Sequence, residues 1–363
     1  MKLTRLLTCL FLSIMGMSCI QDEAPNAEAD IEECIVPADI LKRDPIIIND
    51  KVTLMVKTET DLTNQAPEFV LTPGATISPA SGTKRDFTSP QKYVVTSEDG
   101  QWSKTYTVVY IVAGISTRYD FEHVEQTGKY QTFYEMDEYE DKRLFDWASG
   151  NPGFSFTGNT SGEFPTSSSD DGKSGKCVKL QTMSTGSFGA QLGMPIAAGN
   201  LFMGTFDLGS ALSGSEGALK ATQFGFPFEH VPSYLTGYYK YKAGDVFESG
   251  GKPVEGKIDQ CDIYAIFYET DDKVKMLDGT NAFTHPNLIS VARIKNQKET
   301  NEWTQFYLPF ENMSGKLIDK EKLEAGGYNI AIVFSSSLEG DRFNGAIGST
   351  LYIDEVELIY AAE

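Results

Sequence analysis

Glu355 and Glu357 lie two residues apart near the end of the chain. In an extended strand such residues point to the same face, with backbones roughly 6.6 Å apart. A glycosidase needs two carboxyl groups about 5 to 5.5 Å apart for retention, or about 6.5 to 9.5 Å apart for inversion. The pair is therefore a candidate for hydrolytic catalysis. Solvated acids on an outer strand explain it as well, because the neighbours on that face are isoleucines rather than aromatic rings.

Two other carboxylates suggest a metal. Asp354 alternates with Tyr352, Val356 and Leu358 in the final strand pattern, so on this otherwise apolar face it needs a partner. Glu122 occupies the matching position in the segment that opens the same domain. Ca²⁺ takes several oxygen ligands, and we expect a structural calcium where the first and last strands meet. The alternative is that the two carboxylates accept hydrogen bonds from a turn.

An aromatic strand is predicted over residues 259–269. Its odd-numbered residues are apolar and predict a core face: Cys261, Ile263, Ala265 and Phe267. The opposite face then carries Asp262, Tyr264 and Tyr268. These side chains suit a sugar ring, which has an apolar side and a rim of hydroxyls. Tyrosines are also enriched in strands of any function, so a plain sheet surface is the alternative.

Two further aromatic residues are candidates for sugar contact. In the segment 235–242, Leu235 and Tyr239 share the predicted core side, which leaves Tyr238 outward beside Lys240. Trp147 lies in a loop rich in Gly, Ser, Asn and Pro, where it either plugs the end of a sandwich or meets a ligand. We favour the plug and keep Trp147 as a ligand candidate.

The composition excludes other function classes. Lys plus Arg number 31 against 51 Asp plus Glu, a net charge of −20 that would repel nucleic acid. The chain has no phosphate-cradling loop, no dinucleotide fingerprint and no nucleophile-elbow serine before a helix. Its 33 glycines and many aromatic residues favour sheets over helix bundles.

The elements that position these residues are short strands in two units. Residues 39–114 contain β-branched and aromatic segments broken by Pro and Gly, which predicts a small sandwich. Residues 115–363 contain many further strand patterns, and the sole candidate helix covers residues 319–323. Because strands without crossover helices pair antiparallel, we predict an all-β protein whose larger domain is a jelly-roll sandwich.

The N-terminus resembles that of a bacterial lipoprotein. Lys2 and Arg5 precede an apolar run of about a dozen residues, which is too short to span a bilayer and predicts a signal peptide over residues 1–18. Gly16-Met17-Ser18-Cys19 is similar to a lipobox, which implies acylation of Cys19. The acidic residues 21–23 resemble a signal for export to the outer face of the outer membrane. Residues 19–38 are expected to form an acidic spacer.

Once Cys9 has left with the signal peptide and Cys19 has been acylated, three cysteines remain, Cys34, Cys177 and Cys261, and they form no disulfide framework.

Several stretches resemble known families. LTPGATISPASG and YVVTSEDGQWSKTYTVVY resemble the immunoglobulin-like modules near the membrane end of surface glycan-handling lipoproteins. In the larger unit, WASGNPGFSFTG, GMPIAAGNLFMGTFD, FGFPFEHVPSYLTGYYKYKAGD, DQCDIYAIFYE and VFSSSLEGDRFNGAIGSTLYIDEVEL are similar to the putative carbohydrate metabolism domain of secreted lipoproteins. The resemblance implies a jelly roll similar to carbohydrate-binding modules, within a glycan-utilisation system.

We therefore expect a surface-anchored lipoprotein that binds an oligo- or polysaccharide through an aromatic face of its jelly roll. Membrane contact is expected through the lipid alone, and other glycan-utilisation proteins are candidate partners. Two alternatives stay open at this point: a glycoside hydrolase that uses Glu355 and Glu357, and a structural or adhesin-type surface protein.

Overall fold

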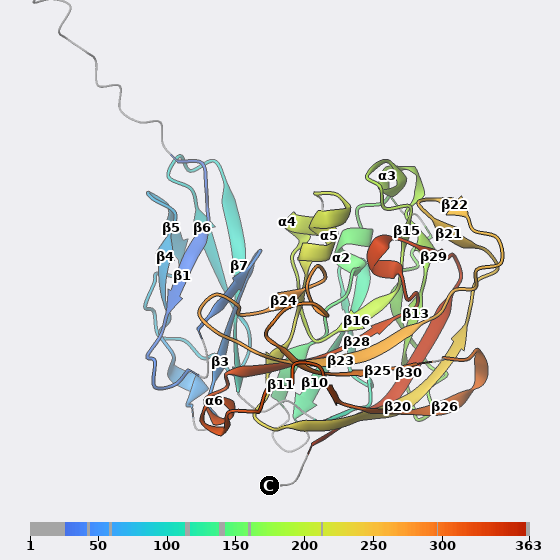
Figure 1. Ribbon diagram of the computed structural model, residues 1–363. Helices are drawn as coiled ribbons and strands as arrows, with labels where there is room; N and C mark the ends of the chain where they lie inside the picture. Colours follow the sequence, from blue (N-terminus) through green and yellow to red (C-terminus); the bar gives the residue numbers. More distant parts are fainter. Residues whose placement is uncertain are drawn as a thin grey trace, which may run out of the picture.

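A computed structural model describes residues 26–41, 44–57, 60–112, 117–137, 142–158, 161–211, 213–295 and 297–360. The predicted signal peptide, Cys19 and the acidic residues 21–23 lie outside this part of the chain. Figure 1 shows a smaller β domain, formed by the first strands, beside a larger one that contains the rest. Among the described residues, no helix has the length and apolar character needed to cross a membrane.

The smaller domain is a sandwich of two sheets. One sheet pairs β1 (Ile31–Ile35) with β4 (Glu68–Leu71), next to the 3-10 helix η1 (Leu62–Asn64). The other has the order β2 (Ile46–Ile48), β3 (Lys51–Val56), β7 (Ser103–Val112), β6 (Gln91–Thr96) and β5 (Thr76–Ser78). Strand β7 alternates, with Tyr106, Val108 and Tyr110 in the core. One boundary needs correction: β1 lies within residues 19–38, the expected spacer, because Ile31 and Cys34 are apolar enough to join that core.

The larger domain contains two six-stranded sheets, each built from antiparallel pairs. The first sheet comprises β12 (Thr166–Ser169), β13 (Cys177–Gln181), β30 (Thr350–Tyr360), β20 (Pro232–Lys242), β26 (Thr300–Pro309) and β8 (Arg118–Tyr119). The second comprises β16 (Asn200–Phe202), β28 (Tyr328–Ser335), β23 (Asp262–Glu269), β25 (Leu288–Arg293), β27 (Glu311–Asn312) and β19 (Phe226–Pro227). The two sheets enclose one apolar core, which confirms the predicted all-β sandwich.

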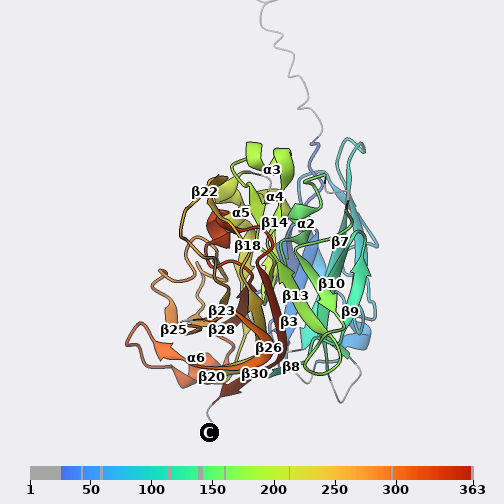
Figure 2. The same ribbon diagram turned by 90° about the vertical axis from the view of Figure 1, so that its right-hand side faces the viewer.

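Smaller elements surround the two sheets. Short helices and a small sheet lie beside β23 and β28: α2 (Asn151–Phe154), α3 (Gly186–Gln191), α4 (Leu208–Ala211), α5 (Ser215–Ala221), β17 (Gly204–Phe206), β18 (Thr222–Phe224) and β24 (Leu277–Asp278). The others are β9 (Val124–Thr127), β10 (Tyr130–Asp137), β11 (Lys142–Asp146), β14 (Met183–Ser184), β15 (Ile196–Ala197), β21 (Phe247–Ser249), β22 (Lys252–Pro253), β29 (Gly345–Ala346), η2 (Gly340–Arg342) and α6 (Lys320–Glu324). Figure 2 gives a second view of this arrangement. Helix α6 matches the predicted helix, and Asp319 caps it by accepting a hydrogen bond from the Lys322 N–H at 3.1 Å.

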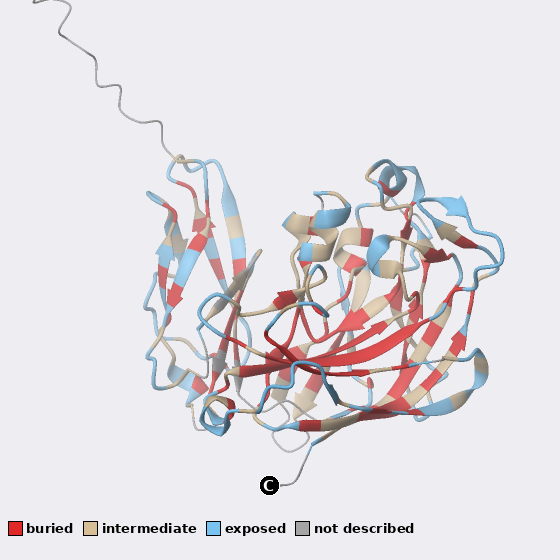
Figure 3. Cartoon of the chain, viewed as in Figure 1, coloured by how far each residue is buried: buried red, intermediate tan, exposed pale blue. Residues whose placement is uncertain are grey.

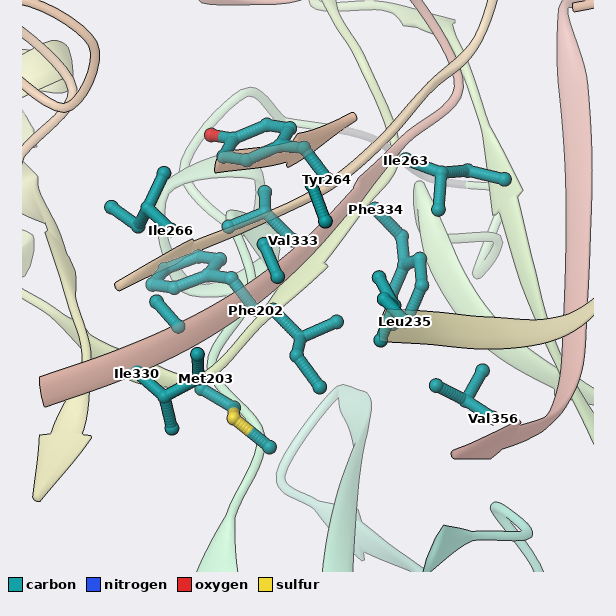
Figure 4. Packing of buried hydrophobic residues seen from close by; sticks show 14 of the residues in the cluster. Phe202, Met203, Leu235, Ile263, Tyr264, Ile266, Ile330, Val333, Phe334 and Val356 are labelled. Carbon is teal, nitrogen blue, oxygen red and sulfur yellow. The ribbon is translucent and has the colours of Figure 1, made fainter. Parts of the chain in front are cut away.

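Both faces of β23 are buried. Ile263, Ala265 and Phe267 are fully buried in the core, as the alternation predicts. Figure 4 shows Leu235, Phe334 and Val356 close together in this core, with the Tyr264 ring apart from them. The opposite residues of β23 are buried as well, because the helices and the small sheet cover them, and β23 and β28 appear almost wholly red in Figure 3.

Strand β30 contains a bulge that changes its predicted faces. Opposite β20, Tyr238 pairs with Asp354 and Thr236 with Glu357, so β30 has one extra residue between these pairs. Glu355 adopts a φ of 48°, in the left-handed region. The core-facing residues are therefore odd-numbered before the bulge and even-numbered after it: Leu351, Ile353, Val356 and Leu358. The expected single face with Tyr352 and Asp354 beside Val356 and Leu358 was wrong, because strict alternation does not survive a bulge.

Candidate functional site

The first candidate site is a pocket of about 230 Å³ between the second sheet and its covering elements, which we call the aromatic pocket. Its sheet side carries Asp262 and Tyr264 from β23 and Arg293 from β25. Residues two apart on a strand share a face, and Arg293 lies directly opposite Tyr264 in the ladder. All three side chains therefore point into the covered side of the sheet. The covering side adds aromatic residues from loops, from α3 and from the short strand β17: Phe188, Phe206, Phe283 and Phe343.

A charged pair lies in this pocket. Arg293 donates from Nε to Asp262 Oδ1 at 3.0 Å and from Nη2 to Asp262 Oδ2 at 2.6 Å. Asp262 is 4% exposed, so burial raises its pKa, and the two hydrogen bonds from Arg293 oppose that rise. The carboxylate uses two guanidinium N–H groups and leaves the others for a ligand. A bidentate pair of this kind is rigid and fixes the orientation of the guanidinium.

Aromatic rings surround the charged pair. The rings of Tyr264 and Phe283 have centroids 4.9 Å apart and are tilted by 56°. The Arg293 guanidinium lies 4.5 Å from the Phe283 ring centre, a cation–π distance. Phe283 and Phe188 are exposed, whereas Tyr264 is 7% exposed. The pocket thus combines accessible apolar rings with a fixed hydrogen-bond donor, which suits a ligand with an apolar face and polar edges.

Two predicted sugar-binding residues are enclosed and cannot stack on a ligand. Tyr268 is fully buried, and its hydroxyl donates to the Phe224 carbonyl at 2.5 Å and accepts from Asn329 Nδ2 at 2.8 Å. Trp147 is 2% exposed, and its Nε1–H donates to Glu135 Oε1 at 2.7 Å. The plug predicted for Trp147 is therefore its actual role, and the ligand role is excluded by burial.

Tyr238 lies in the other sheet, away from the aromatic pocket. It is half-buried on β20, and the Lys173 ammonium lies 4.3 Å from its ring centre. The expected division of this strand is confirmed, because Leu235 and Tyr239 are in the core. Tyr238 and Tyr264 therefore do not form one binding face. Of the predicted residues, the structure brings together Asp262 and Tyr264.

Glu355 and Glu357 line a different hollow, of about 430 Å³, which we call the acidic cleft. They come from β30, whereas the other acids come from β10 and from the segment around β8: Asp120, Glu135 and Asp137. Arg118, Tyr119 and His123 complete most of its lining. Glu355 and Glu357 thus line a hollow whose acids come from three segments rather than from one strand, and a catalytic role for the pair stays a prediction.

Glu122 and Asp354, the predicted calcium ligands, meet the same loop. Glu122 Oε1 accepts from the Lys176 N–H at 2.8 Å, and Asp354 Oδ2 accepts from the Lys173 and Ser174 N–H groups at 2.6 and 3.1 Å. Donor groups aimed at carboxylate oxygens favour the hydrogen-bonding alternative over a hard cation. The described residues contain no group of three or more His, Cys, Asp or Glu side chains arranged for a metal. Calcium at this position stays a prediction.

Two residues of the aromatic pocket, Arg293 and Phe283, were not predicted from the sequence. Arg293 had a signal, because it is the one charged residue in the otherwise apolar segment LISVARI, and a charge in such a strand needs a partner. Phe283 had none, since it lies in a turn after β24 whose position depends on distant parts of the chain.

Comparisons with known proteins agree with this architecture. Residues 120–359 match the family model described as "Putative carbohydrate metabolism domain", and residues 42–109 match one described as "SGBP, N-terminal", the N-terminal domain of surface glycan-binding proteins. No curated protein matches the sequence.

Two solved structures are similar at high identity. A "putative glycoside hydrolase" from Bacteroides thetaiotaomicron is 59% identical, with a TM-score of 0.85 over 94% of this chain and 100% of that one. Another protein with the same description, from Bacteroides vulgatus, is 45% identical, with a TM-score of 0.64 over 68% of this chain and 99% of that one. The two family matches identify a glycan-related surface protein. By the match over residues 120–359, the chain belongs to the putative carbohydrate metabolism domain family.

Proposed function

We propose that the protein is a lipid-anchored surface protein that binds a glycan in its aromatic pocket. The observation that carries the proposal is the Phe283 ring beside the Asp262–Arg293 pair. A sugar ring places its apolar face on such an aromatic plane, while its hydroxyls accept from the remaining guanidinium N–H groups. The two family matches support a glycan as the ligand class.

The anchor is the acyl group expected on Cys19, with the N-terminal sandwich as a spacer between membrane and pocket. Contacts between the domains support a spacer of defined geometry. Asn49 Nδ2 donates to the Phe206 carbonyl at 3.2 Å, and Lys51 Nζ lies 3.6 Å from Asp146 Oδ2. Cys19→Ala should release the protein from the membrane fraction with the fold intact; retention of that variant would contradict the anchor.

The binding experiment is isothermal titration against a panel of host and plant oligosaccharides. Phe283→Ala should weaken binding about tenfold, which corresponds to about 1.4 kcal/mol. Stability should change little, because this ring is 39% exposed. Tyr307→Ala is the matched control, since Tyr307 is an exposed aromatic residue of the other sheet, and it should bind like the wild type.

Tyr264→Ala is unsuitable as a pure binding variant, because Tyr264 is too buried to be removed without loss of stability. Wild-type affinity in Phe283→Ala, or no binding of any glycan by the wild type, would overturn the pocket as the site.

A further inference from the structure

The floor of the aromatic pocket changes in character from one edge to the other. A row of paired residues crosses the second sheet, in which Phe202 pairs with Val333 and Val333 pairs with Tyr264. Tyr264 in turn pairs with Arg293, and all four residues line the pocket. Neighbouring strands are roughly 4.8 Å apart, so the three steps of the row span about 14 Å. The row runs from an apolar end, at Phe202 and Val333, to a polar end, at Tyr264 and Arg293.

The polar end has hydrogen-bonding groups that the protein does not use. Tyr264 is 7% exposed and lines the pocket, and within the described part of the chain its hydroxyl has no hydrogen-bond partner. Figure 4 shows this hydroxyl directed away from the core residues Leu235 and Val356. Arg293 keeps guanidinium N–H groups that Asp262 does not occupy. Because buried polar groups normally have partners, we expect a ligand to place its own polar groups at this end.

The rest of the described lining offers a ligand few polar partners. Its other hydroxyl and amide side chains each bond within the protein: Thr157, Thr185, Asn200, Thr222, Ser335 and Ser337. A ligand hydroxyl placed away from the polar end would therefore lose its hydrogen bonds to water without an equal replacement, which weakens binding.

The apolar end is narrow and enclosed. Phe224 of β18 joins it, and the rings of Phe202 and Phe224 meet edge to face with centroids 5.4 Å apart. Val333 is 5% exposed, Phe224 3% and Phe202 1%. So little accessible surface suits a methyl-sized group rather than a ring. Burial of a methyl group here is favourable, whereas a hydroxyl in the same place would have no partner.

The charges of the pocket disfavour an acidic ligand. The charged residues of its lining are Asp262, Asp341 and Arg293. Two carboxylates against one guanidinium leave a surplus of negative charge. A carboxylate or sulfate on the ligand would be repelled by that surplus.

We propose that the aromatic pocket selects a neutral sugar that carries a methyl group. The methyl group occupies the apolar end, and the sugar hydroxyls bond to the polar end. This selectivity rests on the proposed function, because it requires that a glycan binds in this pocket. The methyl group belongs either to a 6-deoxyhexose or to an acetyl substituent, and the experiment separates these two sources.

The experiment is isothermal titration with free monosaccharides at millimolar concentration, taken in matched pairs. L-Fucose is compared with L-galactose, L-rhamnose with L-mannose, and N-acetyl-D-glucosamine with D-glucose. The first two pairs differ by one oxygen atom on the terminal carbon, and the third tests an acetyl methyl group. In at least one pair, the methyl-bearing sugar should bind about tenfold more tightly or better, which corresponds to about 1.4 kcal/mol. D-Glucuronic acid should bind less tightly than D-glucose, because of the surplus of negative charge.

A variant tests the apolar end directly. Val333→Thr keeps the shape of the side chain and adds a hydroxyl there. The preference should fall to about threefold or less, because the new hydroxyl can bond to the hydroxyl of the sugar that lacks the methyl group. Val291→Thr is the matched control, since Val291 is 8% exposed in the same sheet and lies outside the pocket lining. Both variants should lose similar stability in thermal melts, but only Val333→Thr should change the preference.

Equal binding within all three pairs would overturn this selectivity and leave the proposed function standing. A full preference in a folded Val333→Thr variant, or tighter binding of the uronic acid than of glucose, would do the same. So would an oligosaccharide whose binding is lost in Phe283→Ala, if none of the monosaccharides binds. If no glycan of any kind binds, the proposed function falls together with the selectivity. The wild-type pairs give this test even if Val333→Thr does not fold.

Discussion

Asp262 in the aromatic pocket and Glu135 in the acidic cleft are equally buried, at 4% exposed each, but they are bonded very differently. Asp262 accepts two hydrogen bonds from a guanidinium, whereas Glu135 accepts one from a neutral indole. A buried carboxylate is tolerated when a cation compensates it, and otherwise it takes up a proton. Burial alone therefore does not define the role of an acid. Its partner decides whether it stays a fixed anion or holds a proton.

The largest expected effect is on the pH dependence of stability through Glu135. The folded-state pKa of Glu135 is about 8, above the ordinary 4.5. Between pH 4.5 and pH 8 the folded protein therefore keeps the Glu135 proton, whereas the unfolded chain has released it. This contribution to stability is fully present below about pH 4.5 and is lost as pH rises towards 8. The free energy of unfolding should fall by about 3 to 5 kcal/mol across this range. Glu135→Gln should remove that dependence, which urea titrations of both proteins at pH 5 and pH 8 would reveal. Parallel pH curves for the two would contradict the assignment.

The second prediction turns Asp262 into an uncompensated acid. Arg293→Met should destabilise the fold by about 3 kcal/mol, because it leaves a buried carboxylate without its cation. The loss should grow with pH, since the unpaired Asp262 then has to be protonated to stay buried. Lys295→Met is the control, because its partner Glu311 is exposed, and it should cost under about 1 kcal/mol. Denaturant melts of the two variants would compare their losses in free energy of unfolding. Equal losses would show that the buried pair stabilises the fold no more than the exposed pair does.

The smallest expected effect concerns Asp354, a third buried carboxylate with yet another kind of partner. Burial raises its pKa to about 6, while backbone N–H groups of residues 173, 174 and 355 oppose the rise. If calcium also binds here, chelation at a metal level of a hundred times Kd should remove about 2.7 kcal/mol of stability. Asp354→Ala should abolish that response. If a chelator leaves the melting temperature unchanged and elemental analysis finds no metal, calcium is excluded. The hydrogen bonds alone would then explain how Asp354 is held.

Much of the architecture was predictable because it depends on local periodicity. The alternation over residues 259–269 predicted that Ile263, Ala265 and Phe267 face the core, and they do. The absence of long helical patterns predicted an antiparallel all-β fold. The predicted acidic spacer, residues 19–38, was too long because it included β1. The apolar residues of β1 are few, and they form a core face only when β4 pairs with this strand.

The candidate sites depended on contacts that no local pattern records. Period-2 alternation shows which residues avoid the core, but it cannot show that helices and loops from residues 150–222 will cover the opposite face of β23. That covering enclosed Tyr268 and left Tyr264 on a pocket. One extra residue in β30 reversed the faces beyond Asp354 and placed Glu355 in a left-handed conformation. The sequence by itself therefore determined the fold class, the glycan-related family and the main core face. The tertiary structure decided which acids meet a cation, a backbone N–H or an open cleft, because those partners come from segments far apart in the chain.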